Sequence, residues 1–268
     1  MVGIPNRESR RDTFLGNAED YSAVRPEYPP DLLQAALEFG QIAPRASLLE
    51  IGCGTGEVTE WFARRGFQIL ALDRSPEMAN LAIARLNALP NVEVRCQDFE
   101  QTALGSRFAG LIFATSYHWL DPNTRLSRCA ESLLPGGALI MLWHTHPLPY
   151  EGFFERIQPI YRRFMPGREP AYSPGMNEEK IRSIIQELEE SHEFGSVLRL
   201  SQEWSRTYDR DSYLRLLNTY SDHRLLLEEQ RAALFRSVAN IIDQEYGGEV
   251  ERPYRTELLI SMRSSEAV

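Results

Sequence analysis

The chain alternates short apolar runs with longer segments in which apolar residues recur every three or four positions. The short runs predict buried strands, and the recurring spacing predicts amphipathic helices. Strands are predicted over 47–53, 68–74, 92–98, 109–115 and 138–144. Because helices are predicted between these strands, the pattern is typical of a parallel sheet covered by helices on both faces.

The pattern changes after the fifth predicted strand. Residues 146–195 carry several prolines and have a helical but irregular pattern, which predicts an insertion rather than a continuous helix. Residues 197–209 and 255–263 have the spacing of strands, with two helices between them. The sequence therefore predicts an α/β fold: a Rossmann-like, mostly parallel seven-stranded sheet with a helical insertion after strand five. The whole chain, 1–268, is predicted to be a single domain.

Local signals at helix ends refine these boundaries. Asp31 is predicted to cap a helix that ends near Gly40, because an aspartate side chain accepts bonds from free backbone N–H groups. A helix is predicted to end near Leu134, where Pro135, Gly136 and Gly137 break it.

Composition and charge narrow the classes of function. The 268 residues are 43% hydrophobic and 25% charged, with a net charge of −9. An acidic surface repels phosphate backbones, so nucleic acid is not the expected partner. The three cysteines have neither disulfide-framework nor zinc-site spacing. Neither a secretory signal nor an apolar run of about 20 residues is evident. We expect a cytoplasmic protein with no metal and no membrane partner.

A glycine-rich segment follows the first predicted strand and opens a helix. It contains Gly52, Gly54 and Gly56, preceded by Glu50. Glycines permit positive φ and let a ligand approach the backbone closely. Dinucleotide sites prefer the spacing G-x-G-x-x-G, whereas the spacing here is G-x-G-x-G. A carboxylate beside the turn suits a cationic ligand and would repel a pyrophosphate.

Acidic residues end the second and third predicted strands. Asp73 lies 17 residues beyond Gly56 (73 − 56), where an acid accepts hydrogen bonds from ribose hydroxyls. The alternative role is a helix cap, for which Ser75 is better placed. Asp98 is predicted to bind an adenine amino group and Phe99 to pack on the ring; the alternative is an ordinary loop start.

The ordered segments LLEIGCGTGEVTEWFARRG, LALDRSPEM and VRCQDFE, followed by the fourth strand, resemble the successive motifs of class I S-adenosylmethionine (SAM) dependent methyltransferases. The resemblance covers residues 47–144. The segments YSAVRPEYPPDLL and SYHWLDP resemble a small-molecule subgroup that includes trans-aconitate and juvenile-hormone-acid methyltransferases. The resemblance implies SAM as cofactor, with S-adenosylhomocysteine (SAH) as product.

The resemblance also implies roles for residues with no clear pattern of their own. Residues 1–40 would cap the SAM site, with Tyr21 and Arg25 near its methionine end and Arg25 meeting the carboxylate. Met78 would pack on adenine, although its helical spacing also suits a core residue. The predicted cofactor-binding residues are Tyr21, Arg25, Glu50, Gly52, Gly54, Gly56, Asp73, Arg74, Met78, Asp98, Phe99 and Thr115.

The acceptor is expected beyond the carboxyl ends of the strands. Tyr117, His118 and Trp119 follow the fourth strand and His144 ends the fifth, so these four are the predicted substrate residues. His118 is the predicted catalytic residue, which would orient or deprotonate the acceptor; its alternative is a structural histidine. Residues 146–195 would form the substrate cap.

These features favour methylation of a small molecule on a hydroxyl or carboxylate oxygen, by a monomer or homodimer. The alternatives are a nucleic-acid methyltransferase, an N- or C-methyltransferase, an NAD-dependent reductase and a SAM-binding regulatory protein. A reductase usually has a Tyr/Lys pair, and Lys180 is the only lysine in the chain. Adenine-N6 enzymes place a D/N-P-P-aromatic run where this chain has residues 116–119.

Overall fold

A computed structural model of the chain describes residues 18–167 and 176–265, with side chains from Tyr21 onward. Parts of the predicted cap (1–17) and of the predicted insertion (168–175) lie outside the described residues. The chain forms two compact units, and each combines segments that are distant in sequence. Of the described residues, the first unit contains 18–26, 145–167, 176–177 and 203–255, and the second contains 27–144, 178–202 and 256–265.

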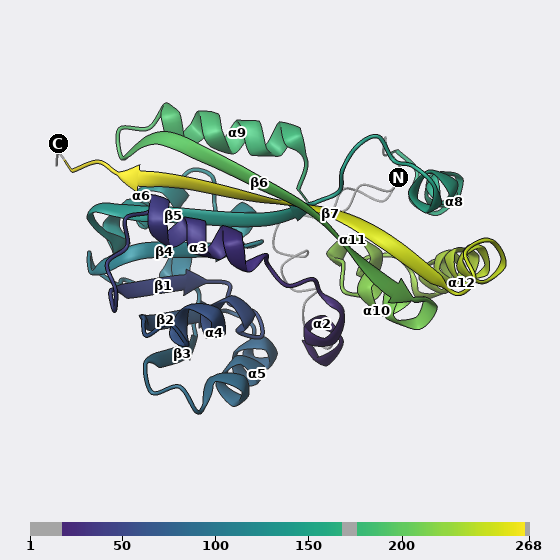
Figure 1. Cartoon of the computed structure of the whole chain (residues 1–268), viewed down its shortest axis with the longest axis horizontal. Helices are drawn as coiled ribbons and strands as arrows, with labels where there is room; N and C mark the ends of the chain where they lie inside the picture. The colour runs from purple at the N-terminus through teal and green to yellow at the C-terminus, as the bar shows by residue number, and fades with distance from the viewer. Residues whose placement is uncertain (1–17, 168–175, 266–268) are drawn as a thin grey trace. The chain divides into compact units, whose positions relative to one another are not determined.

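A seven-stranded sheet runs through the structure in the order β3-β2-β1-β4-β5-β7-β6. Its strands are β1 (Ser47–Ile51), β2 (Gln68–Asp73), β3 (Val92–Cys96), β4 (Phe108–Ala114), β5 (Leu133–Thr145), β6 (Phe194–Asp209) and β7 (Glu249–Arg263). The pairs β1–β2, β1–β4, β2–β3 and β4–β5 are parallel. Figure 1 shows the arrow of β7 running opposite to those of β5 and β6. The predicted α/β fold is confirmed, with the correction that the sheet is mixed.

The fifth strand differs from its prediction at its start. The preceding helix already ends at Ser132 and β5 begins at Leu133, so Pro135, Gly136 and Gly137 lie within the strand and do not end the helix. The pairing with β4 shifts register here, and Gly136 has a φ of +72°. A register shift at a glycine with positive φ indicates a β-bulge or a similar irregularity, and glycine and proline inside strands often mark one. The sequence signal was therefore correct about irregularity but wrong about its kind.

The helices follow the predicted alternation. They are α2 (Ala18–Val24), α3 (Pro30–Phe39), α4 (Glu57–Ala63), α5 (Pro76–Leu86), α6 (Arg125–Ser132), α7 (Phe153–Arg156), α8 (Gln158–Phe164), α9 (Glu178–Glu189), α10 (Arg210–Asn218), α11 (Ser221–Arg224) and α12 (Glu228–Glu245), with 3₁₀ turns η2 (Phe99–Gln101) and η3 (Tyr117–Trp119). Asp31 is not the cap of α3: Pro29 holds that position without a side-chain bond, and Pro30 begins the helix. Proline suits this first position because its missing N–H would be unpaired there in any case.

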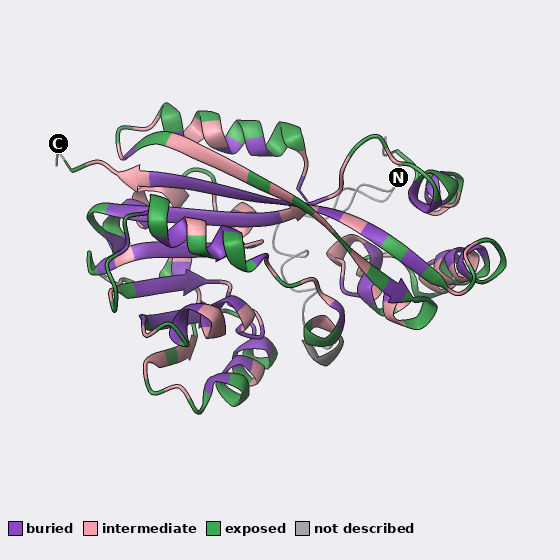
Figure 2. Cartoon of the chain, in the orientation of Figure 1, coloured by how far each residue is buried: buried purple, intermediate pink, exposed green. Residues whose placement is uncertain are grey.

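Each unit has its own core. In the second unit, residues of α3 and α4 pack on strand residues such as Leu48, Ile112 and Ile140, which are all inaccessible to solvent. Figure 2 shows this as a buried β1 beneath helices whose outer faces are exposed. The core of the first unit is rich in aromatic rings, among them Tyr213 and Tyr254. Among the described residues, no helix combines the length and apolar character that a bilayer span requires.

Candidate functional site

The glycine-rich turn between β1 and α4 has the backbone that its sequence predicts. Gly52, Gly54 and Gly56 have φ values of +71°, +58° and +88°. A Cβ on Gly52 would lie 2.6 Å from the Ser116 Cβ, and one on Gly56 would lie 2.9 Å from a Leu86 methyl carbon. Both positions therefore require glycine for conformation and for close approach. Gly52 N–H and Cys53 N–H both donate to the Leu72 carbonyl, which fixes the turn against β2.

Asp73 at the end of β2 joins the glycine turn to the start of α5. Its carboxylate accepts hydrogen bonds from the backbone N–H of Gly54 and of Ser75, both at 2.9 Å. Ser75, rather than Asp73, caps α5 through the Met78 N–H, as the sequence analysis favoured. Burial raises the pKa of Asp73, against the lowering effect of the two backbone N–H groups. The carboxylate thus lies directly on the turn, with further lone pairs for ligand hydroxyls.

Glu50 is a buried acid inside β1, with 1% of its surface exposed. The Thr59 hydroxyl on α4 donates to its carboxyl group. Burial raises the pKa of Glu50 to about 8, with the Thr59 bond opposing the rise and the charges of Glu57 and Asp73 adding to it. The acid before the turn is therefore protonated at neutral pH and ready to ionise beside a cation.

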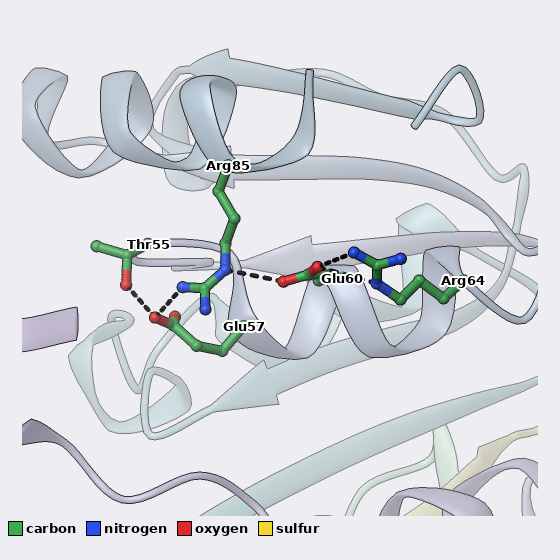
Figure 3. A network of polar contacts seen from close by, with 5 residues as sticks. All are labelled: Thr55, Glu57, Glu60, Arg64 and Arg85. Atoms are coloured by element: carbon green, nitrogen blue, oxygen red, sulfur yellow. Dashed lines mark hydrogen bonds and ion pairs between the residues drawn. The ribbon is translucent and has the colours of Figure 1, made fainter. Parts of the chain in front are cut away.

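A chain of polar contacts extends from the turn across two helices (Figure 3). The Thr55 hydroxyl donates to Glu57 at 2.6 Å, and Glu57 pairs with Arg85 on α5. Arg85 also donates to Glu60 at 2.9 Å, and Glu60 pairs with Arg64. Because Thr55 lies between the turn glycines, this network links the turn to α4 and α5. Partly exposed ion pairs each add little to the free energy of unfolding. We therefore expect this network to orient the turn more than to stabilise the fold.

The remaining predicted cofactor residues of this unit lie along the same strand ends. Met78 on α5 and Phe99 in η2 are buried, with exposures of 4% and 3%. Asp98 accepts from the Glu100 N–H at 3.0 Å and caps η2. Arg74 follows Asp73 and is exposed. Their contacts with adenine or ribose remain predictions.

The turn η3 follows β4 and is attached to the glycine turn. The Ser116 hydroxyl donates to the Ile51 carbonyl at the end of β1. Tyr117 is fully buried against Phe113 with the Arg125 guanidinium over its ring, and its hydroxyl has no partner among the described residues. His118 packs beside Trp119, with ring centroids 4.6 Å apart.

His118 is held by a neighbour on β5. The Trp143 indole N–H donates to His118 Nδ1 at 3.3 Å. Burial lowers the pKa of His118 to about 3, with contributions from the charges of Lys180 and Arg125. The ring is therefore neutral at physiological pH.

A second group of side chains joins the ends of β4 and β5. The hydroxyls of Tyr28 and Thr115 are hydrogen bonded to each other. Tyr28 also stacks on the His144 ring at a centroid distance of 4.3 Å, and His144 Nδ1 bonds the Thr256 hydroxyl at 2.9 Å. Thr115 and His144, predicted for cofactor and substrate, are thus brought together through Tyr28.

Tyr21 and Arg25 belong to the first unit. Arg25 donates to the Thr219 hydroxyl at 2.9 Å and to the Thr219 carbonyl at 3.0 Å. Its guanidinium lies over the rings of Tyr21 and Tyr220, at 4.7 and 4.5 Å from their centroids. Their predicted contact with SAM remains a prediction.

Sequence reasoning missed the residues that orient the predicted ones. Thr59, Trp143 and Tyr28 each bond or stack on a predicted site residue, and Ser116 bonds the Ile51 carbonyl beside the glycine turn. Trp143 precedes His144 on a strand, so alternation alone indicates that the two point to opposite faces. Pairing Trp143 with His118 required the register of β4 and β5, which no local pattern contains.

The donor set of this site fits SAM. A positive-φ glycine turn, a carboxylate at the end of β2 and a buried acid before the turn suit a nucleoside that carries positive charge. Among the described residues, no group of three or more histidine, cysteine, aspartate or glutamate side chains is arranged to hold a metal ion. Burial raises the pKa of the Cys53 thiol well above its usual range, so this cysteine in the turn is not a thiolate.

Comparison with known proteins finds similarity to methyltransferases. Residues 49–141 match a family described as a methyltransferase domain. An uncharacterized methyltransferase of Mycobacterium tuberculosis is 33% identical over 141 residues, covering 51% of this chain and 55% of the relative. A ubiquinone biosynthesis O-methyltransferase of Xanthomonas campestris is 36% identical over 104 residues, covering 37% and 43%. The chain thus spans about half the length of these relatives.

A solved structure supports the fold. Phosphoethanolamine N-methyltransferase 2 of Haemonchus contortus, in complex with SAM, superposes with a TM-score of 0.55 at 16% identity, covering 98% of this chain and 61% of that one. The match to the family lies on the strands and turns that carry Glu50, Asp73 and the glycine turn. Residues 49–141 of this chain therefore match a methyltransferase domain, and the fold of the chain agrees with that match.

Proposed function

We propose that the chain transfers a methyl group from SAM to a small-molecule acceptor, on a hydroxyl or carboxylate oxygen. The observation that carries the proposal is the bond from the Gly54 N–H to Asp73, which fixes an acid at the glycine turn. The proposed cofactor contacts are those predicted from the sequence, with Asp73 on the ribose, Asp98 and Phe99 at the adenine, and Glu50 behind the turn.

SAM supplies an electrophilic methyl group on a sulfonium whose leaving group is neutral. The protein then needs mainly to align the acceptor and exclude water. His118 and Trp119 lie on a turn that Ser116 ties to the end of β1, which supports a role for both in holding an acceptor against the glycine turn. The proposed caps, residues 1–40 and 146–195, would close the site.

The acceptor class is proposed from charge and from the relatives. A net charge of −9 disfavours a nucleic acid, which supports a small molecule. The X. campestris relative is named as an O-methyltransferase, which supports oxygen as the methylated atom. The H. contortus structure is named as an N-methyltransferase, so nitrogen is the second candidate. A monomer or homodimer in the cytoplasm is proposed for the whole protein.

Labelled SAM tests this proposal. The purified chain is incubated with methyl-labelled SAM and panels of small carboxylic acids, alcohols, amines and duplex DNA. Label transfer to a small molecule that is lost in Asp73→Ala supports the proposal. Transfer to DNA alone, or SAM binding without transfer to any acceptor class, would favour the nucleic-acid or regulatory alternatives.

A further inference from the structure

His118 has one fixed hydrogen-bond partner, and that partner determines which ring nitrogen carries the proton. The Trp143 indole has an N–H and no acceptor, so it can only donate. It donates to His118 Nδ1 at 3.3 Å, and Nδ1 must therefore present its lone pair. In a neutral imidazole the proton is then on Nε2. No hydrogen-bond partner of Nε2 is found among the described residues.

This tautomer gives His118 a specific chemistry. Nε2 carries a hydrogen and cannot accept another proton, while the Nδ1 lone pair is already used by Trp143. Removing a proton from an acceptor through Nε2 would require the opposite tautomer and the loss of the Trp143 bond. Trp143 is fully buried on β5, so its indole N–H would then be left without this partner, which is unfavourable for a buried donor.

The charged groups acting on His118 are positive. Lys180 on α9 and Arg125 on α6 both act on the ring, and both favour its neutral form. Lys180 has the larger effect on the ring, and Arg125 is bonded to Glu187 through two guanidinium nitrogens. The charged groups that act on the His118 ring are thus positive, and the Glu187 carboxylate is paired with one of them.

We infer that His118 is a hydrogen-bond donor to the acceptor, through Nε2–H, and that the acceptor presents a carboxylate oxygen that is already ionised. This inference rests on the proposed methyl transfer and narrows its acceptor to carboxylic acids. A carboxylate oxygen donates its lone pair to the methyl carbon, the carbon–sulfur bond breaks, and its electron pair stays on sulfur. No proton is released, so no base is needed. A hydroxyl or ammonium acceptor would need a base.

Substitutions at His118 separate a donor from a base. His118→Gln places an amide N–H near the position of Nε2 but has no basic nitrogen, whereas His118→Ala has neither group. A donor role predicts that the glutamine variant keeps turnover within about tenfold of the wild type. The alanine variant should lose about 10- to 150-fold, the value of a hydrogen bond to a charged group. A base role predicts that both variants lose about 10²–10⁴-fold.

Nitrogen-15 NMR of the whole chain tests the tautomer without any acceptor. We expect the His118 signals to show a neutral ring with the proton on Nε2 from pH 5 to 8, and Trp143→Phe to release this preference. A proton on Nδ1, or titration of His118 near its ordinary pKa of about 6.5, would overturn the inference. This readout is independent of turnover, so it decides the role of His118 even where no acceptor is methylated.

Matched probes test the acceptor class. In the presence of SAH, succinate should shift the His118 Nε2–H signal and 1,4-butanediol should not. With labelled SAM, carboxylic acids should be methylated in preference to alcohols of the same carbon skeleton, with rates flat above pH 5. A preference for the alcohols, with a rising limb near pH 6.5, would contradict the inference while leaving methyl transfer intact. Failure of SAH to bind would instead contradict the proposed function.

Discussion

Replacing Glu50 by glutamine tests the electrostatics of the turn most simply. Glu50 is 1% exposed, and burial raises its pKa to about 8 from an ordinary value of 4.5. Glutamine has nearly the same shape and can still accept the hydrogen bond from Thr59, but it does not ionise. The substitution therefore removes the titration while keeping the packing.

The sign of the effect follows from proton linkage. Between pH 4.5 and about 8 the folded chain keeps a proton on Glu50 that the unfolded chain has released, so stability falls as pH rises. A pKa shift of one unit corresponds to about 1.4 kcal/mol of unfolding free energy, so the shift from 4.5 to about 8 corresponds to about 5 kcal/mol. The free energy of unfolding of Glu50→Gln minus that of the wild type should be near zero at pH 4.5 and rise to a plateau above pH 8.

Urea unfolding at closely spaced pH values measures this difference. Taking the difference cancels other groups, including His118, whose lowered pKa makes stability fall as pH decreases from about 6.5 toward 3. Thr59→Val is the matched control: it removes the hydroxyl donor but keeps the ionisable Glu50, so the pH dependence should persist. A difference that does not change between pH 4.5 and 8 would refute the reasoning.

Three further predictions concern the same site. Binding of cationic SAM at pH 7 should release a proton from Glu50, so the binding enthalpy should depend on the buffer in the wild type and not in Glu50→Gln. Asp73→Ala should weaken SAM binding by about 10- to 150-fold. It should also lower the free energy of unfolding by about 1–3 kcal/mol, because the Gly54 and Ser75 N–H groups lose their acceptor. Unchanged SAM affinity in a folded variant would show that Asp73 only stabilises the turn. Tyr117→Phe should raise the free energy of unfolding by about 1 kcal/mol, because the buried hydroxyl has no hydrogen-bond partner among the described residues. A lower free energy of unfolding, measured with urea, would contradict this and show that the hydroxyl is hydrogen bonded.

Much of the sheet was predictable because each strand is specified locally. The apolar runs that predicted strands at 47–53 and 68–74 became β1 and β2 with ends that differ by one or two residues. The start of β5 was not predictable, because proline and glycine residues indicate irregularity without saying whether it is a loop or a bulge. The reversed direction of β7 depends on long-range pairing, which periodicity does not encode.

In the candidate site, too, some residues were predictable from the sequence and others were not. The glycine turn and Asp73 were predictable because their spacing is fixed by one strand–turn–helix unit. The partners of His118 and His144 were not, since Trp143 and Tyr28 reach them from other elements. Those partners change the expected chemistry. A base needs an available lone pair, but the Nδ1 lone pair of His118 accepts the hydrogen bond from the Trp143 indole N–H.

Calorimetric titration of the full-length chain with SAH, in metal-free buffer, tests the central claim most directly. The account predicts saturable binding at one site per chain that is weakened at least tenfold in Asp73→Ala, with no comparable binding of NAD. Tight NAD binding without any SAH binding would contradict it, because the glycine turn and Asp73 would then serve a dinucleotide.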